Sequence, residues 1–244
     1  ITKKMKCILI SSLLIFGSLA HGERTFVIEK KGVSIHAIEF GKDENSGFRL
    51  IDGGKKKNYV SDHYSPESDA FIINGGYFDG NLNPVGYCRI EGEDLSTVKD
   101  PRLSGFITIT GKGKLTLHWK EIPEKEFRDI VQAGPFIIDP GGRIGIYTRS
   151  GKETKRTVIG QTDDGKILVM TTTEVYLYDL AQILKSELPK LERALNLDGG
   201  PSVGLVYKDV RIENPNPVRN FITKRKGDPD AGINSVTPLR GSTP

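Results

Sequence analysis

The residues best suited to chemistry follow an apolar segment near the end of the chain. Residues 194–197 are mostly apolar; Asp198, Gly199 and Gly200 come next, and Ser202 stands just beyond. A carboxylate where a strand ends can activate water or stabilise a developing positive charge. Glycine amides and a hydroxyl beside it are donors for an anion. The segment predicts a site for an anionic substrate; the simpler alternative is an aspartate that caps a turn.

A similar pattern occurs earlier, where an apolar segment runs into Asn74, Gly75 and Gly76. Glycine permits backbone conformations closed to other residues, and successive N–H groups at such a turn can form an anion-binding nest. Gln132 likewise stands beside a turn at Gly134. Each of these two segments also has a simpler interpretation as an ordinary turn.

The fourth segment contains Arg156 and Thr157 at the start of another apolar run. The planar guanidinium matches phosphate or carboxylate in a bidentate geometry, which makes Arg156 a candidate anion-binding residue. The alternative is a solvated arginine.

Short alternating segments predict that β-strands carry these residues. Turns rich in glycine separate several of the segments and predict hairpins. The expected strands are residues 25–29, 33–40, 48–51, 70–74, 105–110, 114–119, 136–139, 143–147, 156–161, 166–172 and 194–197.

Helical patterns occur at two places only. Residues 123–131 predict a short helix, and residues 178–188 predict a longer one that ends before Pro189, whose ring cannot continue a helix. Strands outnumber helices and do not alternate with them, so the sequence predicts an α+β fold: a single domain with a mixed, mostly antiparallel sheet. The segment from residue 213 onward is polar and rich in proline, and we expect a solvated loop there.

The first twenty residues have the anatomy of an export signal, with lysines before an apolar stretch and small residues at 18–20. The expected domains are therefore a signal peptide at 1–20 and a mature domain at 21–244, exported to the periplasm or medium. An uncleaved anchor is the alternative, although the apolar stretch is short for a membrane span.

Charge and cysteine content limit the partners. The chain carries +4, and removing residues 1–20, which hold three basic and no acidic residues, leaves +1. This balance gives no electrostatic case for nucleic acid, and we infer no protein partner. Only Cys88 remains outside residues 1–20, so the mature domain has no intrachain disulfide, and a buried thiol is expected.

Other motifs fail when their spacing is checked. Asp79, Asn81 and Asn83 have the spacing of the first ligands in a calcium-binding loop, but Pro84 occupies the sixth position, where such a loop requires glycine. The four histidines are far apart in sequence, so no metal site and no cofactor are expected.

Taken together, the four polar segments resemble the phosphodiester glycosidase family, over roughly residues 70–239. The segments stand in the family's order as Asn74-Gly-Gly-Tyr-Phe78, Gln132-Ala-Gly-Pro135, Arg156-Thr-Val-Ile-Gly160 and Leu195-Asn-Leu-Asp-Gly-Gly200. Residues 234–239 resemble the family's terminal strand. The sequence departs from the enzymes of the family at Pro201, and at residues 170–174, where an Asp-Gly is missing.

The resemblance implies hydrolysis of a sugar C1–O–phosphate bond, with free sugar and a phosphomonoester as products. Asp198 is then the principal catalytic carboxylate and Arg156 holds the phosphate, while Glu174, or else Asp79, is a second carboxylate. The implied substrate-binding residues are Asn74, Gly75, Gly76, Gln132, Gly134, Thr157, Gly199, Gly200 and Ser202.

Two other functions compete with this hypothesis. A non-catalytic protein that binds glycosyl phosphates or polysaccharide would keep the pocket without turnover. A metal-dependent phosphodiesterase would lose activity with a chelator, and its sequence support is limited to the region of Asp79.

Overall fold

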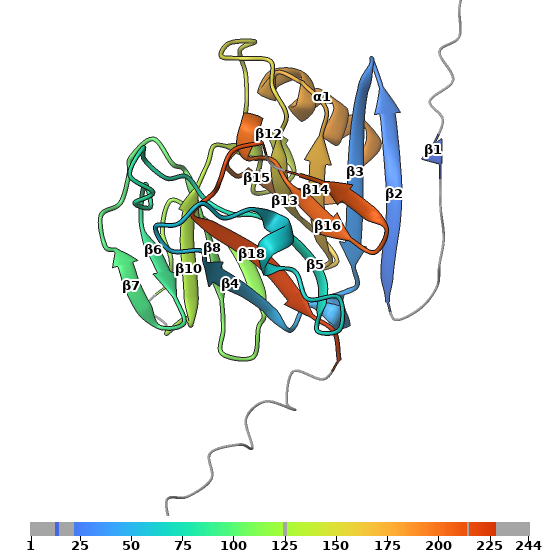
Figure 1. Cartoon of the computed structure of the whole chain (residues 1–244). Helices are drawn as coiled ribbons and strands as arrows, with labels where there is room; N and C mark the ends of the chain where they lie inside the picture. Colours follow the sequence, from blue (N-terminus) through green and yellow to red (C-terminus); the bar gives the residue numbers. More distant parts are fainter. Residues whose placement is uncertain (1–12, 15–21, 124–125, 214, 228–244) are drawn as a thin grey trace, which may run out of the picture.

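The computed structural model describes residues 13–14, 22–123, 126–213 and 215–227. In this part the chain forms three antiparallel sheets and one α-helix, α1 (Leu177–Glu187) (Figure 1). Short 3-10 turns occur at Lys42–Glu44, Val60–His63 and Gly200–Ser202.

The first sheet has eight strands and the other two have five each. The first runs in the order β1 (Leu13–Leu14), β2 (Glu23–Lys30), β3 (Val33–Phe40), β14 (Ile167–Thr172), β13 (Thr157–Thr162), β15 (Leu191–Asn196), β11 (Phe136–Asp139) and β12 (Arg143–Ile144). The second runs β7 (Glu93–Ser96), β6 (Cys88–Ile90), β10 (Asp129–Ala133), β8 (Gly105–Ile109) and β9 (Leu115–Trp119). The third runs β17 (Val210–Ile212), β16 (Leu205–Tyr207), β5 (Asp69–Asn74), β18 (Asn220–Arg225) and β4 (Phe48–Asp52).

The largest apolar core lies where the sheets face one another. Phe40 of the first sheet packs against Phe48 and Phe71 of the third, with ring centroids 5.6 and 5.4 Å away. A second core lies under α1, whose buried Leu180 and Leu184 pack on the first sheet. Full burial of each such side chain contributes roughly 1.5–3 kcal/mol. Mostly antiparallel strands with a single helix confirm the predicted fold class.

The prediction of a helix at residues 123–131 was wrong. Asp129–Ala133 is strand β10, fully buried and paired with β6 and β8. The apolar run is too short for its period to distinguish a buried strand from a helix, and the two flanking strands decide the outcome.

The prediction of a solvated loop after residue 213 was also wrong. Residues 220–225 form β18, which lies inside the third sheet, paired with β5 on one side and with the edge strand β4 on the other (Figure 1). Lys224 is only 6% exposed: its ammonium lies over the Phe40 ring, 5.5 Å from the ring centre, and 3.6 Å from the Glu44 carboxylate. The expected strand at 143–147 is shorter than predicted and ends at Ile144.

Both termini lie mostly outside the described residues. Of the predicted signal peptide only Leu13–Leu14 is described, as strand β1 paired with β2. The expected terminal strand at 234–239 lies outside the described residues altogether. No helix in the described part of the chain is long and apolar enough to cross a membrane.

Candidate active site

Ends of strands from two sheets meet at Asn74, the last residue of β5. Its fully buried side chain donates from Nδ2 to the Asp198 carbonyl at 2.8 Å. Its Oδ1 accepts from the Thr157 hydroxyl at 2.7 Å and from the Gly204 amide at 3.2 Å. Asn74 and Thr157, both predicted to bind substrate, therefore bond to one another and fix the start of β13 relative to the turn after β15.

Asp198 lies two residues beyond the end of β15 and is partly buried. Its Oδ1 accepts from the Gly199 amide at 2.9 Å, and the buried Ser202 hydroxyl also bonds to the carboxylate. Burial raises the pKa of Asp198, while the bonds from Ser202 and Gly199 act to lower it. The result is a carboxylate with more proton affinity than a surface aspartate, suited to accept a proton from water.

The glycine amides expected to hold a phosphate are already donating within the fold. Gly75 donates to the Asn220 carbonyl at 2.8 Å and Gly76 to Asn220 Oδ1 at 2.7 Å. Gly199 donates to Asp198, and Gly200, at φ +62°, donates to the Lys155 carbonyl at 2.8 Å. None of the four is free to bind an anion in this arrangement, which leaves that task to side chains.

Arg156 retains an unused donor beside this turn. Its Nε and Nη2 donate to the carbonyls of Val175 and Lys152, at 3.3 and 2.5 Å. Nη1 has no hydrogen bond to a described residue, and it lies 3.9 Å from where a Cβ on Gly199 would stand. Arg156 has no ion pair within the described chain, and burial lowers its pKa without threatening its charge. A partly buried cation with a spare N–H beside Gly199 can bind an anionic group of the substrate.

Tyr77 is a central residue of the site that sequence reasoning did not select. Its hydroxyl lies 2.7 Å from the Gly134 carbonyl and 2.9 Å from the Leu197 carbonyl, and it accepts from Asn196 Nδ2 at 2.7 Å. Burial raises the pKa of Tyr77, and the Asp198 charge raises it further. Both Tyr77 and Asn196 stand inside the quoted motifs, so their signal was present in the sequence.

Asn220 is a second missed residue, and its segment was interpreted as a loop. Its Oδ1 receives the Gly76 amide, and a Cβ on Gly75 would stand only 2.0 Å from that oxygen. The close approach explains why glycine is required at position 75. No local sequence signal links residues 75 and 220, because β5 and β18 pair only in the folded sheet.

Gln132 lies away from the Asp198 turn and holds two loops together. Its Oε1 accepts from the amides of Tyr87 and Asp100, and its Nε2 donates to the carbonyls of Asp100 and Leu103. All its hydrogen-bonding capacity is used within the fold. The Gly134 carbonyl accepts a hydrogen bond from the Tyr77 hydroxyl.

Neither of the two candidates for a second carboxylate takes part in these contacts. Glu174 is exposed, in the turn next to Val175. Asp79 accepts three hydrogen bonds from Asn81 and Asn83, which lower its pKa and close its own turn. The shift at Asp198 has burial, Ser202 and Gly199 as its causes, and none of these is a second acid. Among described residues, no three His, Cys, Asp or Glu side chains form a group that could hold a metal ion.

The two departures from the family pattern fit the local structure. Pro201 lies in the first turn of the 3-10 helix at Gly200–Ser202, where a missing N–H costs no hydrogen bond. Where the Asp-Gly is missing, the Thr172 hydroxyl accepts from the Arg156 amide at 3.1 Å and donates to the Thr173 carbonyl. Thr172 therefore anchors the backbone of Arg156.

Comparison with solved structures finds the same fold elsewhere. The zebrafish N-acetylglucosamine-1-phosphodiester alpha-N-acetylglucosaminidase catalytic domain, auto-inhibited by its pro-peptide, matches with a TM-score of 0.67 and 16% identity, over 89% of this chain and 88% of that one. A hypothetical protein from Synechocystis matches with a TM-score of 0.65 and 14% identity, over 89% of this chain and 64% of its own length. Such low identities establish the fold alone.

Sequence comparison provides the family. No curated protein sequence matches the chain significantly. The phosphodiester glycosidase family model matches residues 68–226, well over half of the chain and all four polar segments. The predicted resemblance is thus confirmed, and with it the assignment as a hydrolase: the chain belongs to the phosphodiester glycosidase family.

Proposed function

We propose that the protein is exported and hydrolyses the C1–O bond between a sugar and a phosphate. The oxygen of water bonds to C1, the C1–O bond breaks, and its electron pair stays on the phosphate oxygen. The water proton passes to the Asp198 carboxylate, and the products are free sugar and a phosphomonoester. A phosphate ester leaves readily, so one carboxylate is sufficient for this reaction.

The observation that carries the proposal is that a cation without an ion pair lies beside the turn that carries a partly buried carboxylate. Asp198 is partly buried with a raised pKa, and the unused Nη1 of Arg156 lies beside the next residue, Gly199. The carboxylate can act at C1 while the guanidinium holds the phosphate, where negative charge develops. The bond from Ser202 acts to lower the pKa of Asp198. Asn74, which also bonds to Thr157, holds the backbone carbonyl of Asp198 in place. The membership in a family of phosphodiester glycosidases supports the same reaction.

Incubation of the full chain with UDP-N-acetylglucosamine in ¹⁸O-labelled water tests the proposal. We expect free sugar carrying the label at C1, together with unlabelled UDP. Sugar 1-phosphate with UMP would instead indicate cleavage between the phosphates. Export is tested separately by sequencing the N terminus of protein recovered from the periplasm and medium, where residues 1–20 should be absent.

Arg156→Lys should lower kcat/KM while leaving the charge in place. In arginine, Nε and Nη2 bind the carbonyls of Val175 and Lys152 while Nη1 stays available to a phosphate. The single ammonium of lysine cannot reach both carbonyls and the phosphate in this geometry. Loss of one charge-assisted hydrogen bond costs about 1.5–3 kcal/mol, so we expect roughly a 10- to 100-fold decrease. Arg143→Lys, an exposed position on β12, is the matched control and should behave as wild type. Equal kinetics in both variants would remove Arg156 from substrate binding.

Ser202→Ala should move the acidic limb of the pH–rate profile to higher pH. Burial already raises the pKa of Asp198, and the hydroxyl bond from Ser202 opposes this effect. Without that bond the carboxylate takes up its proton at a higher pH, and activity that needs the ionised form is lost sooner as pH falls. The test is kcat/KM against pH for both proteins. If the acidic limb of the variant had its midpoint at the same pH as the wild type, or at a lower pH, Asp198 would not be the group whose ionisation activity requires.

A further inference from the structure

The connection between β12 and β13, residues 145–155, forms a rim beside the proposed site. We call it the rim loop. Its Lys152 carbonyl accepts from Arg156 Nη2 at 2.5 Å, and its Lys155 carbonyl accepts from the Gly200 amide at 2.8 Å. Thr154 pairs with Val175 through amide-to-carbonyl bonds in both directions. The loop is therefore attached directly to the anion-binding arginine and to the turn that carries Asp198.

Arg149 holds the outer part of the rim loop in place. Its Nε lies 2.8 Å from Asp179 Oδ2, at the start of α1, and its guanidinium lies 4.0 Å from the centre of the Tyr176 ring. Figure 1 shows this connection projecting beyond the sheets beside α1. These contacts hold the rim loop in one position, so that it extends outward from Arg156.

Positive charge is concentrated along this path. Lys152, Lys155 and Arg156 stand beside one acidic residue of the same segment, Glu153, whereas the charge of Arg149 is already paired with Asp179. The side chains of Lys152 and Lys155 form no ion pair with described residues, so their charges are available to a ligand. Two unpaired lysines in the segment that leads to Arg156 suit a ligand that carries more than one phosphate.

An exposed aromatic ring completes the rim loop. Tyr147 is 75% exposed, the most exposed large hydrophobic side chain among the described residues. A tyrosine offers a flat apolar face and a polar hydroxyl, and an isolated exposed ring beside a polar site suits a sugar ring. Its exposure follows from the early end of β12 at Ile144, which leaves Tyr147 outside any sheet.

We propose that the rim loop binds the part of the substrate beyond the cleaved bond, and that this substrate is a polymer of sugars joined through phosphodiesters. The inference rests on the proposed function, which places the cleaved phosphate at Arg156. Lys152 and Lys155 then take a further phosphate of the polymer, and Tyr147 takes one of its sugars. A nucleic acid is disfavoured because the chain carries a net charge of only +4.

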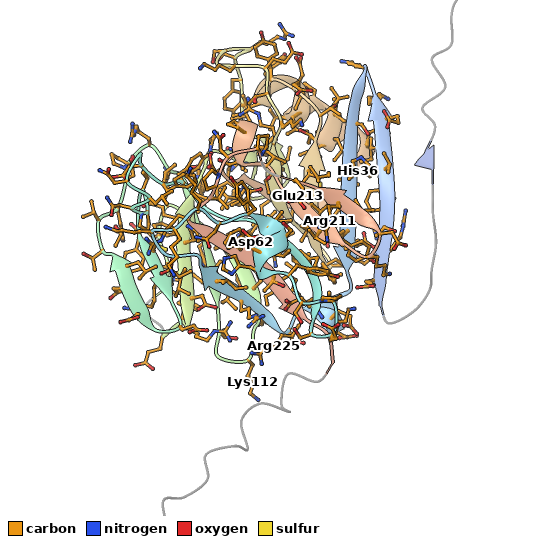
Figure 2. All side chains as sticks on the ribbon, in the orientation of Figure 1. His36, Asp62, Lys112, Arg211, Glu213 and Arg225 are labelled. Atoms are coloured by element: carbon orange, nitrogen blue, oxygen red, sulfur yellow. The ribbon has the colours of Figure 1, made fainter. Side chains whose placement is uncertain are left out.

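Binding assays with labelled oligomers of N-acetylglucosamine 1-phosphate test the inference. Fluorescence anisotropy compares a multi-repeat oligomer with a single repeat, in the Asp198→Asn background so that nothing is cleaved. The test variant combines Tyr147→Ala with Lys152→Ala. The control is Lys112→Ala, an exposed lysine that Figure 2 shows at the opposite end of the molecule.

We expect the double variant to weaken binding of the multi-repeat oligomer about 10- to 100-fold and to leave the single repeat nearly unchanged. Binding of the oligomer should fall with added salt, less steeply in the variant than in the control.

Three results would overturn the inference. The first is that the Asp198→Asn protein binds the multi-repeat oligomer no more tightly than the single repeat. The second is that the double variant binds the oligomer as tightly as the Asp198→Asn protein does. The third is that a single-stranded DNA of matched charge binds as tightly as the oligomer. Failure of the proposed function is distinguishable, because it is the absence of cleavage of both oligomer and UDP-N-acetylglucosamine by the wild-type protein. Loop-dependent binding without cleavage would support the rim loop as a polymer-binding surface and reject the hydrolysis.

Discussion

Asp198→Asn should reduce kcat by about 10²–10⁴-fold, the range for losing a positioned acid–base group. The amide keeps the size of the side chain, and its oxygen can still accept from the Gly199 amide, so the turn should hold its shape. What is lost is the negative charge, and with it the ability to accept the water proton. The measurement is product release from UDP-N-acetylglucosamine, together with the thermal unfolding midpoint.

Asp209→Asn is the matched control for this variant. Asp209 lies exposed in the turn between β16 and β17, so the same chemical change there should alter neither activity nor stability. Turnover at the wild-type rate in Asp198→Asn would remove Asp198 from the mechanism. A strongly lowered unfolding midpoint would instead show that the carboxylate is structural, and the loss of activity would then say nothing about chemistry.

Asn74→Ala should destabilise the fold by about 3–5 kcal/mol, through the loss of a buried hydrogen-bond network. The change leaves the Asp198 carbonyl, the Thr157 hydroxyl and the Gly204 amide without their partner, all of them far along the chain. Those groups join two sheets, so the site should loosen together with the fold. Chemical denaturation gives the free energy of unfolding directly.

Asn81→Ala provides the comparison for Asn74. The Asn81 side chain is exposed and only its backbone amide bonds to Asp79, so its truncation should change stability by less than about 0.5 kcal/mol. If Asn74→Ala were as stable as wild type but bound substrate poorly, Asn74 would contact the substrate and the structural role would be rejected.

Local sequence patterns predicted the elements that carry the site. The strands that end at Asn74, begin at Thr157 and precede Asp198 are all present, within a few residues of their expected bounds. Their signals are strong because each is a compact apolar run followed by glycine or a polar side chain. Helix α1 was equally well marked by its apolar face and by Pro189.

Other elements could not be read from local pattern. β10 has an apolar run that suits a helix as well as a strand, and only pairing with β6 and β8 selects the strand. β18 ends in a lysine and an arginine, Lys224 and Arg225, and such residues usually indicate an exposed segment. Burial of Lys224 depends on Phe40 and Glu44, which are distant in sequence and adjacent only after folding.

The sequence by itself determined the family, the antiparallel fold and the positions of the polar segments. These follow from residue types at short spacing, where the chain's own geometry brings side chain and turn together. The tertiary structure alone decided which polar groups remain available to a ligand. The amides of Gly75 and Gly76 are engaged by Asn220, and Gly200 by Lys155, whereas Nη1 of Arg156 has no partner in the described chain. Hydrogen-bond availability depends on partners from distant strands, because a buried donor is satisfied by whatever acceptor the fold places beside it.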